Sequence, residues 1–130
     1  LGIAKRVTFC GRVGHEDLVT LYGQAGGFLF PSLYEGFGFP PLEAMVNGVP
    51  VLASNVTSVP EVVGDAALIV DPYSVSEIAE GMVRLTVDQE LRRTLIERGS
   101  ARASLLSWES AAAAMLKVYR DVLANRRIRG

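Results

Sequence analysis

The sequence predicts an α/β fold with an open parallel sheet and helices on its faces, and two observations support this. Short apolar runs alternate with helical patterns through the first half of the 130-residue chain, and these runs are apolar at nearly every position. Near-continuous hydrophobic strands are typical of parallel strands, which are buried on both faces. We therefore expect a Rossmann-like or flavodoxin-like sheet, followed by a helical C-terminal part.

Four strands are expected along the chain. The first is "RVTFCG", Arg6–Gly11, in which Cys10 would be a buried strand residue. The others are "FLF", "VPVLAS" and "ALIV", at 28–30, 49–54 and 67–70. Each is bounded by residues that disfavour a strand, so each is expected to end in a loop that leads to a helix.

Helix start and stop signals lie between and after these strands. "PPLEAMVNG" opens with prolines, which suit a first helical turn, and closes at Gly48, which suits a helix end. Ser74 and Glu77 have the spacing of a capping box, and Asp88 can cap the helix that follows it. Trp108 begins an apolar stripe with steps of three and four, so we expect it in the core rather than as a stacking platform.

Length and composition predict one soluble globular domain, residues 1–130, in which 105–130 form a C-terminal helix. The chain begins "LGIAKRVTF", without methionine, and is interpreted as an N-terminally incomplete part of a longer protein. Its net charge of −1 gives no electrostatic footprint for nucleic acid. The arginines of the tail, 125–130, are interpreted as a solvated helix end.

Other classes of site find no support in the sequence. A single cysteine excludes an internal disulfide framework and fits a reducing compartment, so we expect a cytoplasmic protein. No run approaches the roughly 18 apolar residues of a membrane span. No His, Cys or Asp cluster has metal-ligand spacing and no P-loop occurs, so neither a metal nor another cofactor is expected.

The stretch "PSLYEGFGFPPLEAM", residues 31–45, lies where ligands bind in such sheets, beyond the carboxyl end of a strand. Gly36 and Gly38 allow the backbone to approach a ligand closely. Successive amides ahead of a helix N-terminus form a cradle for an anion, which the helix dipole strengthens. The sequence therefore predicts that this loop holds a phosphate or a developing negative charge.

Two carboxylates flank this loop, and each has a structural and a functional interpretation. Glu43 would lie in the first turns of the helix, where an acid complements the dipole, or it would accept hydrogen bonds from a ligand's hydroxyls. Glu35 would be a turn residue that faces water, or a carboxylate held over the crevice to accept sugar hydroxyls. The residues alone leave both pairs of alternatives open.

The spacing of these glutamates resembles a known family. "EGFGFPPLE" is an E-x7-E motif, which is similar to the signature of retaining, nucleotide-sugar-dependent glycosyltransferases of the GT-B class. The similarity extends in register over about residues 7–123, through these segments: "VTFCGRV", "LVTLYGQAGGFLFPSLYEGFGFPPLEAMVNGVPVLASN", "SVPEVVGDAALIVDP" and "SWESAAAAMLKVYRDVL". A lone E-x7-E is weak evidence, but the motif within this context is specific.

The resemblance implies the C-terminal, donor-binding domain of a two-domain enzyme whose N-terminal domain brings the acceptor. It implies transfer of a sugar, with GDP-mannose as the first guess for the donor, with retention and without a metal. Glu35 becomes the candidate catalytic residue near the donor sugar, and Glu43 would bind the ribose. The donor-binding residues that it implies are Gly36, Phe37, Gly38, Phe39, Glu43 and, along the base in the turn Gly11–Val13, Val13.

The same resemblance leaves some parts unaccounted for. The family carries an Arg and a Lys on an earlier strand and loop that grip the diphosphate, and no residue of this chain matches them. Gly26-Gly27 and His15 also depart from the pattern, and His15 is interpreted as a solvated turn residue. A membrane is expected as a partner only through a lipid-linked acceptor.

Rival interpretations share the architecture. A flavodoxin-like signalling module such as a receiver domain needs a phosphorylatable Asp after a strand, whereas "FLF" is followed by Pro31-Ser32. A phosphorylase needs a pyridoxal-binding lysine, which this sequence lacks. A sugar-nucleotide epimerase and a catalytically silent domain remain as alternatives, and the register of "PSLYEGFGFPPLEAM" favours a transferase over the epimerase.

Overall fold

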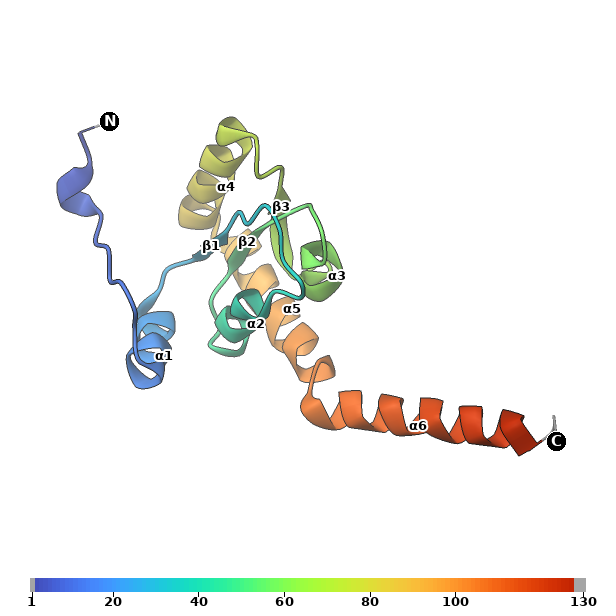
Figure 1. The fold of residues 1–130 in the computed structure, drawn as a ribbon. Helices are drawn as coiled ribbons and strands as arrows, with labels where there is room; N and C mark the ends of the chain where they lie inside the picture. Colours follow the sequence, from blue (N-terminus) through green and yellow to red (C-terminus); the bar gives the residue numbers. More distant parts are fainter. Residues whose placement is uncertain (1, 128–130) are drawn as a thin grey trace.

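The computed structural model describes residues 2–127, with the side chains of 125–127 left out. Its elements in chain order are η1 (Ala4–Arg6), α1 (His15–Gln24), β1 (Phe28–Phe30), α2 (Phe39–Val46), β2 (Val51–Ser54), α3 (Val59–Val63), β3 (Ala67–Val70), α4 (Val75–Val87), α5 (Gln89–Leu105) and α6 (Trp108–Arg127) (Figure 1). The arginine side chains of the tail, 125–130, lie outside the described residues, so their interpretation stays a prediction.

The described strands form one parallel sheet in the order β1-β2-β3. Phe28 lies opposite Val51, which in turn lies opposite Ala67. Each strand is followed by a helix before the next strand begins, which is the connection that parallel neighbours require. The predicted α/β fold with an open parallel sheet flanked by helices is confirmed.

Both faces of the sheet are covered, and β2 shows how. Val51 and Ala53 belong to a core cluster shared with α2 and α3, whereas Leu52 between them belongs to a cluster shared with α4 and α5. Alternate side chains of a strand point to opposite faces, so the two clusters lie on opposite sides of the sheet. Gly81 of α4 lies against Leu52, where an added Cβ would be 2.4 Å from Leu52 Cδ1.

The helix signals in the sequence correspond to real helix ends. Pro40 and Pro41 lie in the first turn of α2, and Gly48, just after its end, has a φ of +71°. Ser74 accepts from the Glu77 N–H at 3.3 Å at the start of α4. Asp88 Oδ1 accepts from the backbone N–H of the third residue of α5 at 2.9 Å. The helix ends and the Ser74 and Asp88 caps are confirmed, but the capping box is not reciprocal, because Glu77 Oε2 accepts from the Asp71 N–H at 2.9 Å and not from the Ser74 N–H.

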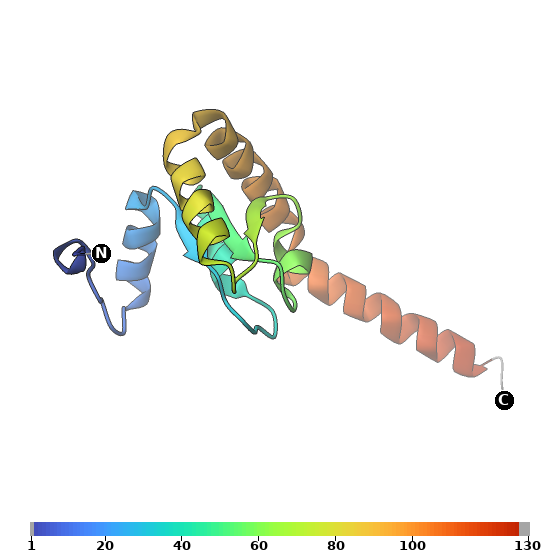
Figure 2. The ribbon, with the colours of Figure 1, turned by 90° about the horizontal axis from the view of Figure 1, so that it is seen from above.

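The strand predicted at Arg6–Gly11 is wrong. Ala4–Arg6 form a 3₁₀ turn, and the chain from there to α1 has no regular structure. Cys10, predicted as a buried strand residue, is exposed, and Phe9 is 93% exposed. A strand is stable only when it is paired, and this segment lies away from the sheet in both views (Figures 1 and 2).

The prediction that Trp108 lies in the core is also wrong. Helix α6 projects away from the sheet in both views, and Trp108 is 80% exposed. Its indole stacks on the ring of Phe39 with centroids 6.4 Å apart. An apolar stripe indicates which face of a helix can be buried, but within residues 2–124 no element packs along that face.

Candidate functional site

The loop between β1 and α2, residues 31–38, lies at the carboxyl end of β1, as predicted. Gly38 is the N-cap of α2 and has φ 101° and ψ 58°, a conformation that other residues rarely adopt. Gly38 is buried, and an added Cβ would contact Val59 and Phe30 at 3.9 and 4.0 Å. The turn therefore depends on glycine for its conformation more than for space.

Glu35 is half-buried in this loop, and its side chain and backbone both have partners. Ser32 Oγ donates to Glu35 Oε1 at 2.8 Å. The Glu35 N–H donates to Thr57 Oγ1 at 3.2 Å. The carboxylate is thus held from within its own loop, and its backbone is held from the loop that follows β2.

Two hydroxyl residues after β2 fasten the Glu35 loop. Ser58 Oγ contacts two backbone carbonyl oxygens, those of Glu35 and Phe37, at 3.0 Å each. Thr57 has a φ of +55°, an uncommon backbone conformation for a β-branched residue. Backbone strain of this kind is concentrated at functional sites, where neighbouring contacts maintain it. The sequence analysis missed both residues; their signal is a pair of hydroxyls after β2 at the same edge of the sheet.

Four successive amides, from Gly36 to Phe39, have no hydrogen-bond acceptor among the described residues. Pro40 and Pro41 follow them and carry no N–H. The start of α2 therefore concentrates its free donors at the end of the Glu35 loop, where the helix dipole also favours negative charge. Phe37 and Phe39 are 40% and 51% exposed, with ring centroids 4.6 Å apart.

Glu43 lies one turn further along α2 and is exposed. Tyr22 Oη of α1 lies 3.3 Å from Glu43 Oε2 and 3.4 Å from the backbone oxygen of Pro40. Burial raises the pKa of Tyr22 to about 12, with the Glu43 charge and hydrogen bond acting in the same direction. The phenol is therefore protonated at neutral pH and donates to the carboxylate.

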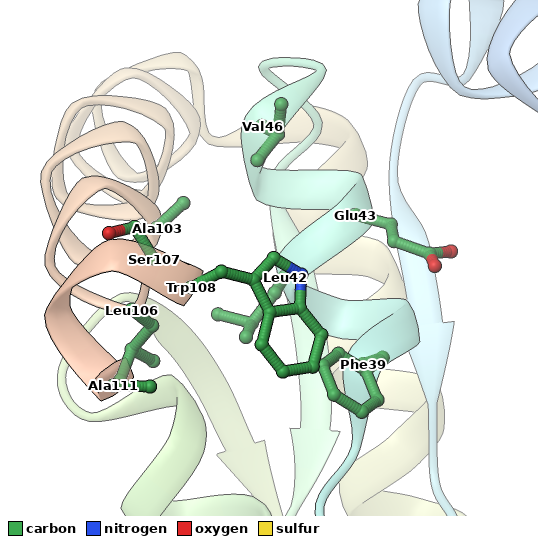
Figure 3. Close-up of a pocket in the computed structure, with 9 residues that line it drawn as sticks. All are labelled: Phe39, Leu42, Glu43, Val46, Ala103, Leu106, Ser107, Trp108 and Ala111. Atoms are coloured by element: carbon green, nitrogen blue, oxygen red, sulfur yellow. The ribbon is translucent and has the colours of Figure 1, made fainter. Parts of the chain in front are cut away.

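Two pockets meet at Glu43, one on each side of α2. The first, of 260 Å³, lies between α2 and the α5–α6 junction and is mostly apolar, with Trp108 and Phe39 on its wall (Figure 3). Figure 3 shows the Glu43 carboxylate pointing away from Trp108. The second, of 330 Å³, lies between α1 and α2, and its polar lining residues are His15, Tyr22, Glu43 and Asn47.

The structure does not bring every predicted site residue to one place. Glu35, the amides of Gly36 to Phe39, and Glu43 follow one another along the loop and α2. Val13 is half-buried in the segment before α1, and no hydrogen bond among the described residues links Gly11–Val13 to them. His15, interpreted as a solvated turn residue, is exposed but lines the α1–α2 pocket with Glu43.

Two kinds of feature are absent from the described part of the chain. No group of three or more His, Cys, Asp or Glu side chains there is placed to hold a metal ion. None of the helices between residues 2 and 127 combines the length and the apolar character needed to cross a membrane.

Comparisons with known proteins agree on one family. Residues 1–102 match the family described as "Glycosyl transferases group 1". O-antigen chain mannosyltransferase B of Escherichia coli is 46% identical over 114 residues, which cover 88% of this chain and 30% of the relative. MMP alpha-(1->4)-mannosyltransferase of Mycolicibacterium hassiacum is 38% identical over 129 residues, covering 96% of this chain and 31% of that relative.

A solved structure supports the same assignment. Sucrose-phosphate synthase of Thermosynechococcus elongatus superposes with a TM-score of 0.81 at 36% identity, covering 95% of this chain and 32% of that one. The chain thus spans about a third of the length of each of these three proteins. With a family match over residues 1–102 and this agreement in structure, the chain belongs to the group 1 glycosyltransferases.

Proposed function

We propose that this chain is the donor-binding part of a glycosyltransferase and that it binds a nucleotide-diphosphate-sugar. One observation carries the proposal: four unpartnered amides, from Gly36 to Phe39, lie between the carboxylates of Glu35 and Glu43 at the end of β1. Amides at a helix start bind an anion, and carboxylates accept hydroxyl hydrogens. A sugar diphosphate presents both kinds of group.

Each part of the donor then has a partner in the chain. The diphosphate lies on the amides of Phe37, Gly38 and Phe39, where fixed dipoles stabilise the charge that develops as it leaves. Glu35, held by Ser32 at 2.8 Å, lies near the donor sugar as the candidate catalytic residue. Glu43 accepts from the ribose hydroxyls, and Val13 would lie along the base. No metal takes part in this scheme.

GDP-mannose is the donor that we propose first, with transfer that retains the anomeric configuration. Two relatives named as mannosyltransferases, at 46% and 38% identity, support mannose as the sugar. The family match over residues 1–102 does not favour a signalling module or a sugar-nucleotide epimerase. We further propose that a separate domain brings the acceptor, and that the enzyme acts in the cytoplasm, at the membrane's inner face if the acceptor is lipid-linked.

An amide NMR titration with GDP, UDP and ADP, followed by their sugar conjugates, tests the proposal. We expect GDP to shift the amide signals of Gly36, Phe37, Gly38 and Glu43 more than UDP or ADP does. Glu43→Gln should weaken the response. Glu80→Gln, an exposed carboxylate on α4, is the matched control and should leave it unchanged.

The outcomes separate the parts of the proposal. If UDP or ADP shifts these signals more than GDP does, the proposed base changes from guanine to uracil or adenine, and the proposed site stays the same. If no nucleotide shifts the amide signals, either in this chain or in a chain extended upstream of Leu1, the proposal is wrong. We expect this chain alone to transfer no sugar, and measurable turnover by it would contradict the requirement for a separate acceptor domain.

A further inference from the structure

Tyr22 occupies a position that packing of its ring does not fully explain. It is 6% exposed on α1, and its ring meets Phe28 of β1 edge-on, with centroids 5.5 Å apart. This contact fixes the ring between α1 and the sheet. A phenylalanine would provide the same contact, so the hydroxyl needs a separate explanation.

The Tyr22 hydroxyl is directed at α2 through two acceptors. Its oxygen lies 3.3 Å from Glu43 Oε2 and 3.4 Å from the backbone oxygen of Pro40. These distances are longer than the usual range of about 2.5–3.0 Å for O–H···O, as expected when one proton is shared between two acceptors. The charged acceptor attracts the proton more strongly, so Glu43 is its principal partner.

Glu43 depends on this one contact. Among the described residues, no other side chain donates a hydrogen bond to its carboxylate. An exposed glutamate without a fixed partner samples several rotamers, which weakens recognition of a ligand. Because Tyr22 contacts only Oε2, the other carboxylate oxygen remains available as an acceptor.

The pocket between α1 and α2 is the place where a ligand would meet the Glu43 carboxylate. Its 330 Å³ lies within the range of small-molecule pockets, roughly 300–1,000 Å³. Tyr22, Glu43, His15 and Asn47 line it, and Figure 3 shows the Glu43 carboxylate directed away from the Trp108 pocket on the other side of α2. The carboxylate is thus directed to the α1 side of its helix.

We propose that Tyr22 is a positioning residue that holds the Glu43 carboxylate in the geometry that accepts the two ribose hydroxyls of the donor. This role rests on the proposed function, because it assumes that Glu43 contacts the ribose. Tyr22 acts through Glu43, because its hydroxyl is already directed at Glu43 and at the backbone oxygen of Pro40. Preference for a ribonucleotide over its dideoxy analogue therefore depends on the Tyr22 hydroxyl.

Calorimetry with GDP and 2′,3′-dideoxy-GDP tests the inference, on this chain or, if only that form binds GDP, on the chain extended upstream of Leu1. Hydrogen bonds to a charged group predict that the wild type prefers GDP by about tenfold or more. Tyr22→Phe should lose most of this preference by binding GDP more weakly, while its affinity for the dideoxy analogue stays unchanged. A merely structural role would weaken both ligands together.

Two controls make the result specific. Tyr73→Phe removes a hydroxyl from a residue that is 74% exposed, and it should keep the wild-type preference. Glu43→Gln should lose the preference, and adding Tyr22→Phe to it should change nothing further. If Tyr22→Phe keeps the full preference, this inference is wrong and the proposed function stands. If the wild type binds neither nucleotide in either form, the proposed function fails and the role of Tyr22 fails with it.

Discussion

Glu35 and Glu43 are eight positions apart in the chain, and they are held in place by different means. Glu35 lies in a loop, half-buried, with Ser32, Thr57 and Ser58 bonded to its side chain or backbone. Glu43 lies on α2, exposed, with one phenol near its carboxylate. Helix α2 already fixes the backbone of Glu43, whereas a loop residue needs neighbours to fix both backbone and side chain.

This difference separates two kinds of dependence. The placement of Glu35 depends on contacts between the loops that follow β1 and β2, so changes in either loop should displace it. The placement of Glu43 depends on the start of α2 and on a single side chain of α1. Gly38 connects the two regions, because it ends the loop and begins the helix.

Substitution of Gly38 should have the largest effect, because it disturbs both carboxylates. Gly38→Ala places a side chain at φ 101°, and we expect it to lower the free energy of unfolding by about 1–2 kcal/mol. Gly36→Ala is the matched control in the same loop. Gly36 is not among the residues with positive φ, and an added Cβ meets nothing within 4 Å, so the change should stay within about 0.5 kcal/mol.

Chemical denaturation of the two variants measures this difference. Equal destabilisation by Gly36→Ala and Gly38→Ala would show that the loop responds to any side chain. In that case the left-handed conformation of Gly38 would not be the reason for its glycine.

Removal of the Ser58 hydroxyl should affect the Glu35 side alone. Ser58→Ala leaves the carbonyls of Glu35 and Phe37 without this donor, and we expect a loss of about 1 kcal/mol in the free energy of unfolding. Amide hydrogen exchange should rise at Glu35, whose N–H donates to Thr57 next to Ser58, and remain unchanged in α1. Ser104→Ala is the control, because its exposed hydroxyl bonds only to Ala101 within α5. Faster exchange throughout the chain, or no increase at Glu35, would contradict a local role for Ser58.

Local chemistry explains which parts of the site could be predicted. One short stretch, residues 31–45, contains the prolines of α2, Gly38 and the two glutamates. The order of these residues was enough to predict where the strand ends, where the loop lies and where the helix begins. Thr57 and Ser58 lie more than 20 positions after Glu35, and only the parallel pairing of β1 and β2 brings the loops together. The role of the Tyr22 hydroxyl could not be predicted from the sequence, because its partner is on another helix.

The fold shows the same limit. "VTFC" within Arg6–Gly11 and "FLF" at 28–30 have similar composition, but only the second is a strand. Phe28 to Phe30 pair with β2, whereas Phe9 is exposed and its segment lies away from the sheet. Strand propensity describes what a segment can do, and a neighbouring strand decides whether it does so. The same holds for the helix that begins at Trp108, because an apolar stripe does not specify which element will pack against it.

The effect on the Glu43 side is confined to high pH, and it appears in a titration. The Tyr22 phenol is neutral when protonated and negative when ionised. Burial and the nearby Glu43 charge disfavour the negative form, so the folded pKa of about 12 exceeds the unfolded value of about 10. A raised pKa stabilises the fold below pH 10, and this contribution is lost as the pH rises from about 10 to about 12. Over that interval the free energy of unfolding should fall more steeply in the wild type than in Tyr22→Phe.

Glu43→Gln separates the causes of that pKa. Burial is the largest cause and remains in the variant, whereas the charge of Glu43 is removed. The pKa of Tyr22 should therefore fall part of the way from about 12 toward 10, which ¹³C NMR of the labelled tyrosine ring measures directly. Glu80→Gln, far along the chain on α4, should leave it unchanged. An unchanged pKa in Glu43→Gln would mean that the phenol does not sense the carboxylate, and Glu43 would then lack the contact that distinguishes its placement from that of Glu35.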